Sequence, residues 1–142
     1  MHLVLLLVYS LLSATSPFLE ARGNITVRVT NVNNKKGAVM LALFSSSKGF
    51  PYETSYAIQK QKGNAVNGVI ELSFTDIPPG TYAIALFHDT NNDGKLNTNF
   101  MGIPKEGYGV SNNTYNTFSA PGYKESSFSH SDMTELTIQM KY

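Results

Sequence analysis

The sequence contains no cysteine and no tryptophan among its 142 residues, and only 15% of them are charged. Without cysteine the chain cannot form a disulfide, so its irregular segments must be held by packing, hydrogen bonds or a metal ion. A thiol nucleophile is excluded for the same reason. The formal net charge is +1, which gives no electrostatic attraction to a polyanion, and no nucleic-acid partner is expected.

Long hydrophobic runs are also scarce. Residues 3–8 and 11–12 are apolar, and small residues follow at 13–16. This apolar stretch is too short to cross a bilayer as a helix, and it predicts a signal peptide over residues 1–21. The alternative is a buried N-terminal strand. We therefore expect a secreted or periplasmic protein whose mature chain, residues 22–142, is a single domain without a membrane span.

What the sequence has instead is alternation. Residues 25–30, 70–75 and 135–142 alternate between apolar and polar side chains, while 38–44 and 81–87 are apolar on both faces. A period of two is typical of half-buried strands, and continuous apolar runs are typical of central strands. The pattern predicts an all-β fold, specifically an antiparallel β-sandwich of seven or so strands.

The predicted core consists of the inward-facing apolar residues of these segments. They are Val27, Val29, Leu41, Leu43, Leu72, Phe74, Ile84, Leu86, Ile138 and Met140.

Two long connections interrupt the strands. The first, residues 45–63, is expected to hold at most one short helix, placed within 52–61. The second runs over residues 89–127 and is rich in Asn, Gly, Tyr and Ser. A connection of that length is unusual in a compact domain, so it is functional, disordered or ordered by something other than ordinary packing.

The second connection begins with a calcium-loop pattern. Residues 89–94 read D-T-N-N-D-G, which matches D-x-[DN]-x-[DN]-G, the first half of an EF-hand loop. Alternate side chains of such a tightly curved loop converge on one point, and calcium takes six to eight oxygen ligands. The expected metal ligands are Asp89, Asn91, Asp93, the carbonyl of Lys95, Asn97 and, as an additional carboxylate, Glu106.

The twelfth loop position argues for a weak site. An EF-hand has a bidentate Glu there, whereas this chain has Phe100. With so few carboxylates, the affinity for calcium should lie on the order of 0.1–1 mM. The alternative is a turn without metal, because Asn, Asp and Gly side chains and backbones also stabilise turns by hydrogen bonds alone.

A catalytic site is not evident. His88 and Asp89 are neighbours in an expected strand and so point to opposite faces, and no G-x-S-x-G motif is present. No catalytic residue is therefore assigned. Aromatic side chains could form a binding face for a glycan or protein, or could pack against the sheet. They are Tyr82, Phe100, Tyr108, Tyr115, Phe118 and Tyr123.

The central segment is similar to a known family. Residues 88–113, H-D-T-N-N-D-G-K-L-N-T-N-F-M-G-I-P-K-E-G-Y-G-V-S-N-N, resemble the hallmark of the secreted bacterial family known as domain of unknown function 2141. The turn and strand P-P-G-T-Y-A at residues 78–83 agree as well. The resemblance implies an exported protein with a transthyretin-like or immunoglobulin-like sandwich and no assigned activity. It also implies that Glu106 belongs to the motif and that Asn97 replaces the family's usual Asp.

Three functions are compatible with these observations. The first is a non-enzymatic module in which calcium orders the loop as an interaction surface for an unknown protein or a cell-surface glycan. The second is an extracellular enzyme with a site near His88 and Glu106. The third is a structural domain without metal.

Overall fold

The computed structural model describes residues 17, 19–117 and 119–142. Most of the predicted signal peptide, residues 1–21, therefore lies outside the described residues, and so does Phe118. None of the described helices is long and apolar enough to cross a membrane.

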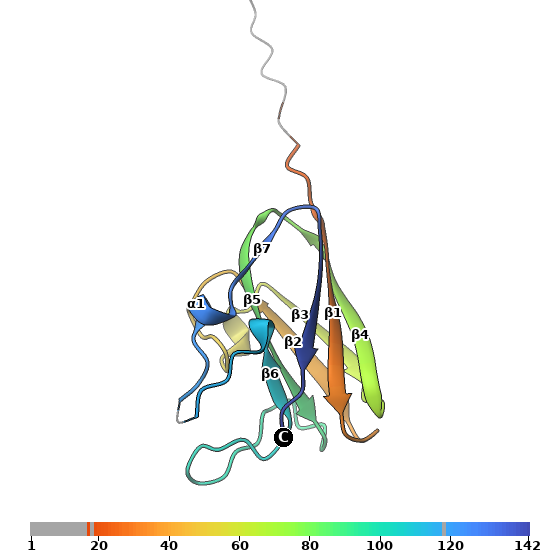
Figure 1. Cartoon of the computed structure of the whole chain (residues 1–142), viewed down its shortest axis with the longest axis vertical. Coiled ribbons are helices and arrows are strands. Elements are labelled where there is room, and N and C mark those ends of the chain that lie inside the picture. Colours follow the sequence, from red (N-terminus) through yellow and green to blue (C-terminus); the bar gives the residue numbers. More distant parts are fainter. Residues whose placement is uncertain (1–16, 18, 118) are drawn as a thin grey trace, which may run out of the picture.

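Two β-sheets face each other in the described residues (Figure 1). One sheet has the order β4-β1-β8, and the other has the order β3-β2-β5-β6, with β7 also paired to β5. The strands are β1 (Gly23–Val32), β2 (Ala38–Phe44), β3 (Gln59–Asn64), β4 (Gly68–Ile77), β5 (Gly80–Asp89), β6 (Tyr108–Val110), β7 (Phe128–His130) and β8 (Met133–Gln139). The expected all-β sandwich is confirmed.

The main core lies between the sheets. Nine of the ten predicted core residues are buried there, and Leu72 is partly buried against them. The alternation explains why: on β1, Val27 and Val29 are buried while Arg28 between them is exposed. Period-two patterning therefore identified the inner faces correctly.

A second, smaller apolar cluster covers the outer face of the five-stranded sheet. Ala42 and Phe44 from β2 meet Ala85 from β5, and Phe50 packs on Phe44 with ring centroids 5.3 Å apart. Because β2 and β5 are apolar on both faces, as their continuous apolar sequences predict, the sheet carries side chains for burial on its outer side as well.

The short helix expected within residues 52–61 is present as a single 3-10 turn. This turn is η1 (Thr54–Tyr56), and strand β3 follows at once. Among the residues that the structure describes, the α-helix is α1 (Tyr123–Ser126), a single turn. Strand β3 reads Q-K-Q-K-G-N and lies at the sheet edge, where neither face needs an apolar residue. Alternation of hydrophobicity therefore could not reveal it.

One strand pair departs from the antiparallel expectation. β1 pairs with β8 in parallel, from Asn24 opposite Met133 to Thr30 opposite Gln139. The chain reaches β8 from β5 through β6, α1 and β7, and this long connection brings it back to the same end of the sandwich at which β1 begins (Figure 1). Parallel neighbours need such a crossover, whereas hairpin-linked strands run antiparallel.

Candidate binding site

The connection between β5 and β6, here called the 89–106 loop, begins as an Asx-stabilised turn. Asp89 is 1% exposed, and its carboxylate accepts the backbone N–H of Asp93 at 3.2 Å and that of Gly94 at 2.9 Å. Gly94 has φ 76°, a conformation that favours glycine. The sequence pattern D-x-N-x-D-G thus folds as the sharp turn that its spacing predicts.

Asp93 holds the second part of this turn. Its carboxylate accepts the side-chain amide of Asn97 at 2.8 Å, the backbone N–H of Lys95 at 2.9 Å and the amide of Asn91 at 3.3 Å. The hydrogen bond from Asn97, followed by that from Lys95, lowers the pKa of Asp93 below its ordinary value of 3.8. Asp93 is thus held as a carboxylate by its own loop.

Glu106 fastens the other end of the loop. It is buried, and its Oε1 accepts both the backbone N–H and the hydroxyl of Thr90 at 3.0 Å. Its Oε2 accepts the backbone N–H of Asn97 at 3.0 Å. The Glu106 carboxylate therefore links Thr90, near the start of the loop, to Asn97, which follows seven residues later. Each of its two oxygens accepts a backbone N–H of the loop.

The six predicted metal ligands all lie in this loop, and hydrogen bonds join five of them, namely Asp89, Asn91, Asp93, Lys95 and Asn97, in one turn. The sixth, Glu106, accepts the backbone N–H groups of Thr90 and Asn97. Within the described part of the chain, no three acidic or histidine side chains surround one point in a way that could hold a metal ion. Any ion here would depend on amide and carbonyl oxygens as well as carboxylates.

Two features of the loop still fit a cation. The side-chain oxygen of Asn97 is buried and has no hydrogen-bond partner. The buried carboxylates of Asp89 and Glu106 also have no ion pair, since among the described residues the salt bridge found joins Arg22 and Asp76. Buried charges are normally paired or bound to metal. These oxygens are of the type that calcium prefers, although both carboxylates, Asp89 and Glu106, already accept backbone N–H groups of the loop.

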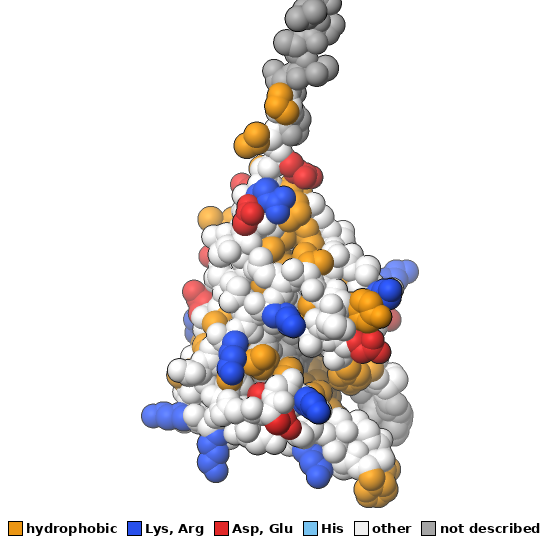
Figure 2. Space-filling model, turned by 180° about the vertical axis from the view of Figure 1, so that it is seen from behind, with side chains coloured by type: hydrophobic (Ala, Val, Ile, Leu, Met, Phe, Trp, Pro, Cys, Tyr) orange, Lys and Arg blue, Asp and Glu red, His pale blue; other side chains and the backbone are white. Residues whose placement is uncertain are grey.

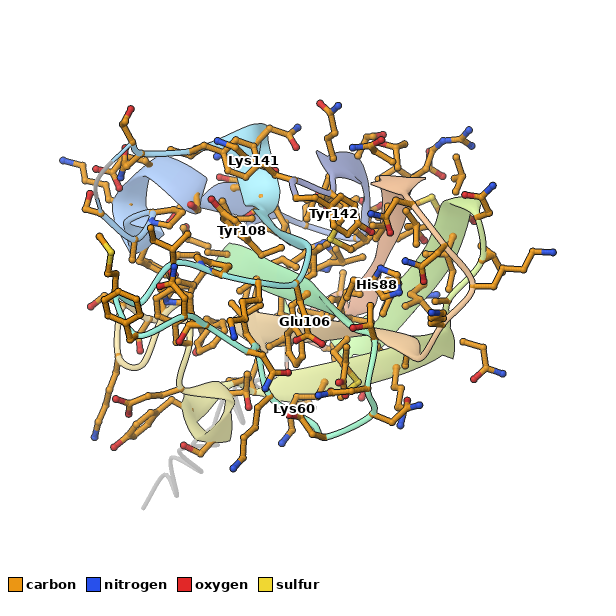
Figure 3. All side chains as sticks on the ribbon, turned by 90° about the horizontal axis from the view of Figure 1, so that it is seen from below. Lys60, His88, Glu106, Tyr108, Lys141 and Tyr142 are labelled. Carbon is orange, nitrogen blue, oxygen red and sulfur yellow. The ribbon has the colours of Figure 1, made fainter. Side chains whose placement is uncertain are left out.

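His88 is occupied by structural hydrogen bonds. Its ring is fully buried, with Nε2 2.7 Å from the carbonyl oxygen of Lys36 and Nδ1 2.7 Å from the hydroxyl of Tyr142 (Figure 3). A carbonyl can only accept, so Nε2 carries the hydrogen, and in the neutral ring Nδ1 then accepts from Tyr142. The structure does not bring His88 into hydrogen-bond contact with Glu106, the pairing that an acid–base site would require.

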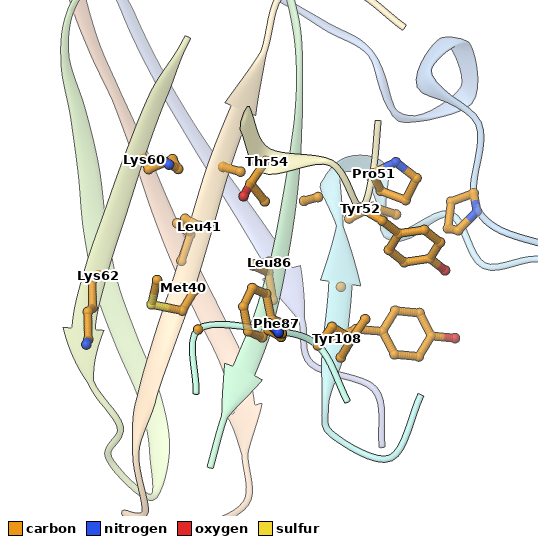
Figure 4. Close-up of a pocket in the computed structure, with 18 of the residues that line it drawn as sticks. Met40, Leu41, Pro51, Tyr52, Thr54, Lys60, Lys62, Leu86, Phe87 and Tyr108 are labelled. Carbon is orange, nitrogen blue, oxygen red and sulfur yellow. The ribbon is translucent and has the colours of Figure 1, made fainter. Parts of the chain in front are cut away.

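A pocket of about 740 Å³ lies beside the loop, on the outer face of the five-stranded sheet (Figure 4). Its floor follows from the strand register. Ala42 on β2 pairs with Ala85 on β5, which pairs with Val110 on β6. These three short side chains lie in one row, next to a row of larger ones. The larger row is Met40, Phe87 and Tyr108.

The walls of the pocket come from two connections. Lys95, Leu96 and Thr98 of the 89–106 loop form one side, and Pro51 and Tyr52, which precede η1, form another. The hydrogen bonds of Asp89, Asp93 and Glu106 therefore fix the shape of a pocket that none of those acids lines.

The tip of the loop is apolar and exposed (Figure 2). Phe100 is 98% exposed, Met101 68% and Ile103 54%. The other aromatic residues considered as one binding face do not form a single face. Tyr82 is buried in the main core, Tyr123 packs on Phe50, and Tyr115 packs edge-on against Tyr108, which lines the pocket.

Sequence reasoning missed the pocket. Its floor depends on Ala42 and Ala85 being paired, and small apolar residues in a strand look like any core position. The apolar residues on both faces of β2 and β5 did indicate that the outer face of their sheet is covered. Because the second sheet covers only the inner face, loops had to cover the outer one.

Comparison with known proteins gives a family and no activity. A family model described as "Uncharacterized protein conserved in bacteria (DUF2141)" matches residues 27–139. Neither the curated proteins nor the solved structures contain a match.

Proposed function

Because the chain belongs to this uncharacterised bacterial family, whose description assigns no activity, we propose a function from the site itself: a non-enzymatic module that binds a small molecule in the outer pocket. The observation that carries this proposal is the pocket, about 740 Å³ in volume, between the Ala42–Ala85–Val110 row and the 89–106 loop. Pockets for small molecules usually measure about 300–1,000 Å³ and are largely apolar with a few polar groups.

The role of the 89–106 loop in this proposal is to shape the pocket wall. No residue of the loop belongs to either apolar cluster of the described residues. The loop is held instead by hydrogen bonds from its backbone to the carboxylates of Asp89 and Glu106. A loop ordered before the ligand arrives loses less conformational entropy on binding. The sequence predicted a calcium-ordered loop that presents an interaction surface to a protein or a glycan, whereas here we propose that the loop shapes a pocket for a small molecule.

A non-enzymatic role is supported by the chemistry of the pocket lining. The lining contains lysines, tyrosines, one glutamine and threonines, and it has no histidine and no carboxylate. Histidine is the commonest general acid or base, followed by carboxylates, whereas a lysine serves as a base at neutral pH when its pKa is lowered by burial or neighbouring groups. His88, the nearest histidine in sequence, has both ring nitrogens engaged elsewhere.

Calcium is part of the proposal as a stabiliser of the loop. Its support is the unpaired, buried Oδ1 of Asn97 together with the buried carboxylate of Asp89. Asp89, Asn91, Asp93 and Asn97 would supply oxygens, and an ion bound there would neutralise charge that no cationic side chain pairs. Export across a membrane, from the apolar segment within residues 1–21, also remains our proposal.

The proposal is tested with a neutral fluorescent probe, N-phenyl-1-naphthylamine, which brightens in apolar sites. We expect saturable brightening with the natural chain. Ala85→Leu and Ala42→Leu add bulk to the pocket floor and should each reduce it strongly, while the melting temperature reports whether each variant is folded.

The matched control is Phe100→Ser, which removes the most exposed apolar side chain of the loop tip and leaves the pocket lining unchanged. Brightening that survives both floor substitutions, or that disappears in Phe100→Ser, would place the probe outside the pocket and contradict the proposed function.

A further inference from the structure

We infer that the outer pocket takes an amphipathic anion with one charged end, its apolar body lying along the alanine row and its anionic group at strand β3. This inference rests on the proposed function, because it names the class of ligand for the same pocket.

The first step is the register of β3. Lys60 pairs with Ala42, and Lys62 pairs with Met40. Directly paired residues share one face of a sheet, so both lysines lie on the face that carries the pocket floor. Across the four strands, the row that contains the alanines consists of Lys60, Ala42, Ala85 and Val110. The neighbouring row of larger side chains consists of Lys62, Met40, Phe87 and Tyr108.

The second step is the shape of these rows. The short side chains of Ala42 and Ala85 lie beside the longer ones of Met40 and Phe87, and all four line the pocket. Four neighbouring strands span about 14 Å, from three gaps of about 4.8 Å each. An alkyl chain or a similarly long aromatic body of that length would cover Ala42 and Ala85 and end near Val110.

The third step is the distribution of charge. The pocket lining contains Lys60, Lys62 and Lys95 and no acidic residue. Figure 4 shows Lys60 and Lys62 at the β3 end of the pocket and Tyr52 and Tyr108 at the opposite end. Burial, with a smaller contribution from Tyr108, raises the pKa of Tyr52 above 10.0, so the hydroxyl of Tyr52 stays neutral.

The lysines would attract the anionic group of a ligand, and the apolar lining would bind its hydrocarbon body. The lysines are exposed, so each contributes a modest, salt-dependent attraction. A neutral molecule of the same shape would keep the apolar contacts and lose that attraction. A cationic one would be repelled by all three ammonium groups.

The test compares three probes with the same ten-carbon body: decanoate, 1-decanol and decylammonium, each titrated below its micelle-forming concentration into the full chain by calorimetry. We expect decanoate to bind about tenfold more tightly than 1-decanol at low ionic strength. The difference should shrink at high salt, and decylammonium should bind most weakly.

Matched variants locate the charge effect. Lys60→Gln with Lys62→Gln should remove most of the preference for decanoate over 1-decanol, and Lys95 accounts for what remains. Lys105→Gln with Lys124→Gln removes the same net charge from lysines outside the pocket lining and should leave the preference for decanoate intact. Equal loss in the two double variants would show a general charge effect and overturn the inference.

The outcomes separate this inference from the proposed function. If decanoate and 1-decanol bind equally and Ala85→Leu weakens both, the pocket is a binding site and the preference for an anion is wrong. If none of the probes binds saturably, or if Ala85→Leu changes nothing, the proposed function fails and the inference fails with it.

Discussion

Glu106 Oε2 accepts the backbone N–H of Asn97 at 3.0 Å, and this contact closes the 89–106 loop across nine residues. The other oxygen of the same carboxylate holds Thr90 through its backbone N–H and its hydroxyl. The loop that forms one wall of the pocket is therefore fastened at its start and its middle by one buried side chain. Hydrogen bonds to a charged group are worth about 1.5–3 kcal/mol each, more than those between neutral groups.

Removing this carboxylate should loosen the loop. In Glu106→Ala the N–H groups of Thr90 and Asn97 lose their acceptor, so we expect a loss of about 2–3 kcal/mol in the free energy of unfolding, measured by urea denaturation. Amide hydrogen exchange at these two residues should accelerate (Figure 3 shows the position of Glu106). Glu135→Ala, at an exposed site on β8, is the control. Unchanged exchange at Asn97 would show that Glu106 does not hold the loop.

Calcium should raise the melting temperature. If the ion binds the native loop only, a concentration 100 times the dissociation constant adds about 2.7 kcal/mol, which corresponds to several degrees. Asp89→Ala and Asp93→Ala should each abolish the shift because each removes a charged ligand. Asn97→Asp should enlarge it by adding one. Differential scanning calorimetry with calcium and with chelator measures these shifts.

The calcium result is controlled by Glu135→Ala, which removes one negative charge far from the loop and should keep the full shift. The loop should also resist proteolysis in calcium and be cleaved in chelator. A melting temperature and a cleavage pattern that chelator leaves unchanged would mean that the loop is held by its hydrogen bonds alone.

Acid should open the Asp93 turn. Hydrogen bonds, first from Asn97 and then from Lys95, lower the pKa of this exposed carboxyl below 3.8 in the folded state. A lowered pKa means that the stabilisation is complete above pH 3.8 and is lost as the pH falls through the folded value. We expect protection of the Lys95 amide to fall in that acidic range, measured by NMR. Asp93→Asn should remove this pH dependence, and a dependence that persists in that variant would assign it to another group.

The hydroxyl of Tyr142 should contribute to stability because it is the hydrogen-bond partner of Nδ1 in the buried ring of His88. It accepts the backbone N–H of Asn33 at 3.0 Å and donates to Nδ1 of His88 at 2.7 Å. Tyr142→Phe leaves that nitrogen without a donor, and we expect a loss of about 1–3 kcal/mol by urea denaturation. Tyr56→Phe, at an exposed tyrosine, should change little. Equal effects of the two substitutions would contradict the assigned role of Tyr142.

Alternation predicted most of this fold because burial on one face leaves a direct trace in the sequence. Val27, Val29 and Ile138 are buried as their spacing requires. The polar edge strand β3 left no such trace, and a short helix was expected in its place. The parallel pairing of β1 with β8 was also beyond the pattern, because alternation specifies faces and says nothing of strand direction.

The loop chemistry was predictable in part. The spacing of Asp89, Asp93 and Gly94 predicted a calcium loop, with a turn held by side-chain hydrogen bonds as the alternative. The hydrogen bonds of such a turn form, and calcium binding stays a prediction. The partners of Glu106 were not predictable, since they depend on how the loop returns to β6. The pocket was hidden for a related reason: the row Lys60, Ala42, Ala85 exists only once three strands are in register.

The most direct test of the outer pocket as a binding site is methyl and amide NMR of the full chain titrated with decanoate. The account predicts saturable shift changes at the methyl groups of Ala42, Ala85 and Val110 and at the amides of Lys60 and Leu96, with little change at Phe100 on the loop tip. Changes confined to Phe100 and Met101, or spread evenly over the surface, would contradict it, because they would mean that apolar ligands contact the exposed tip and leave the pocket empty.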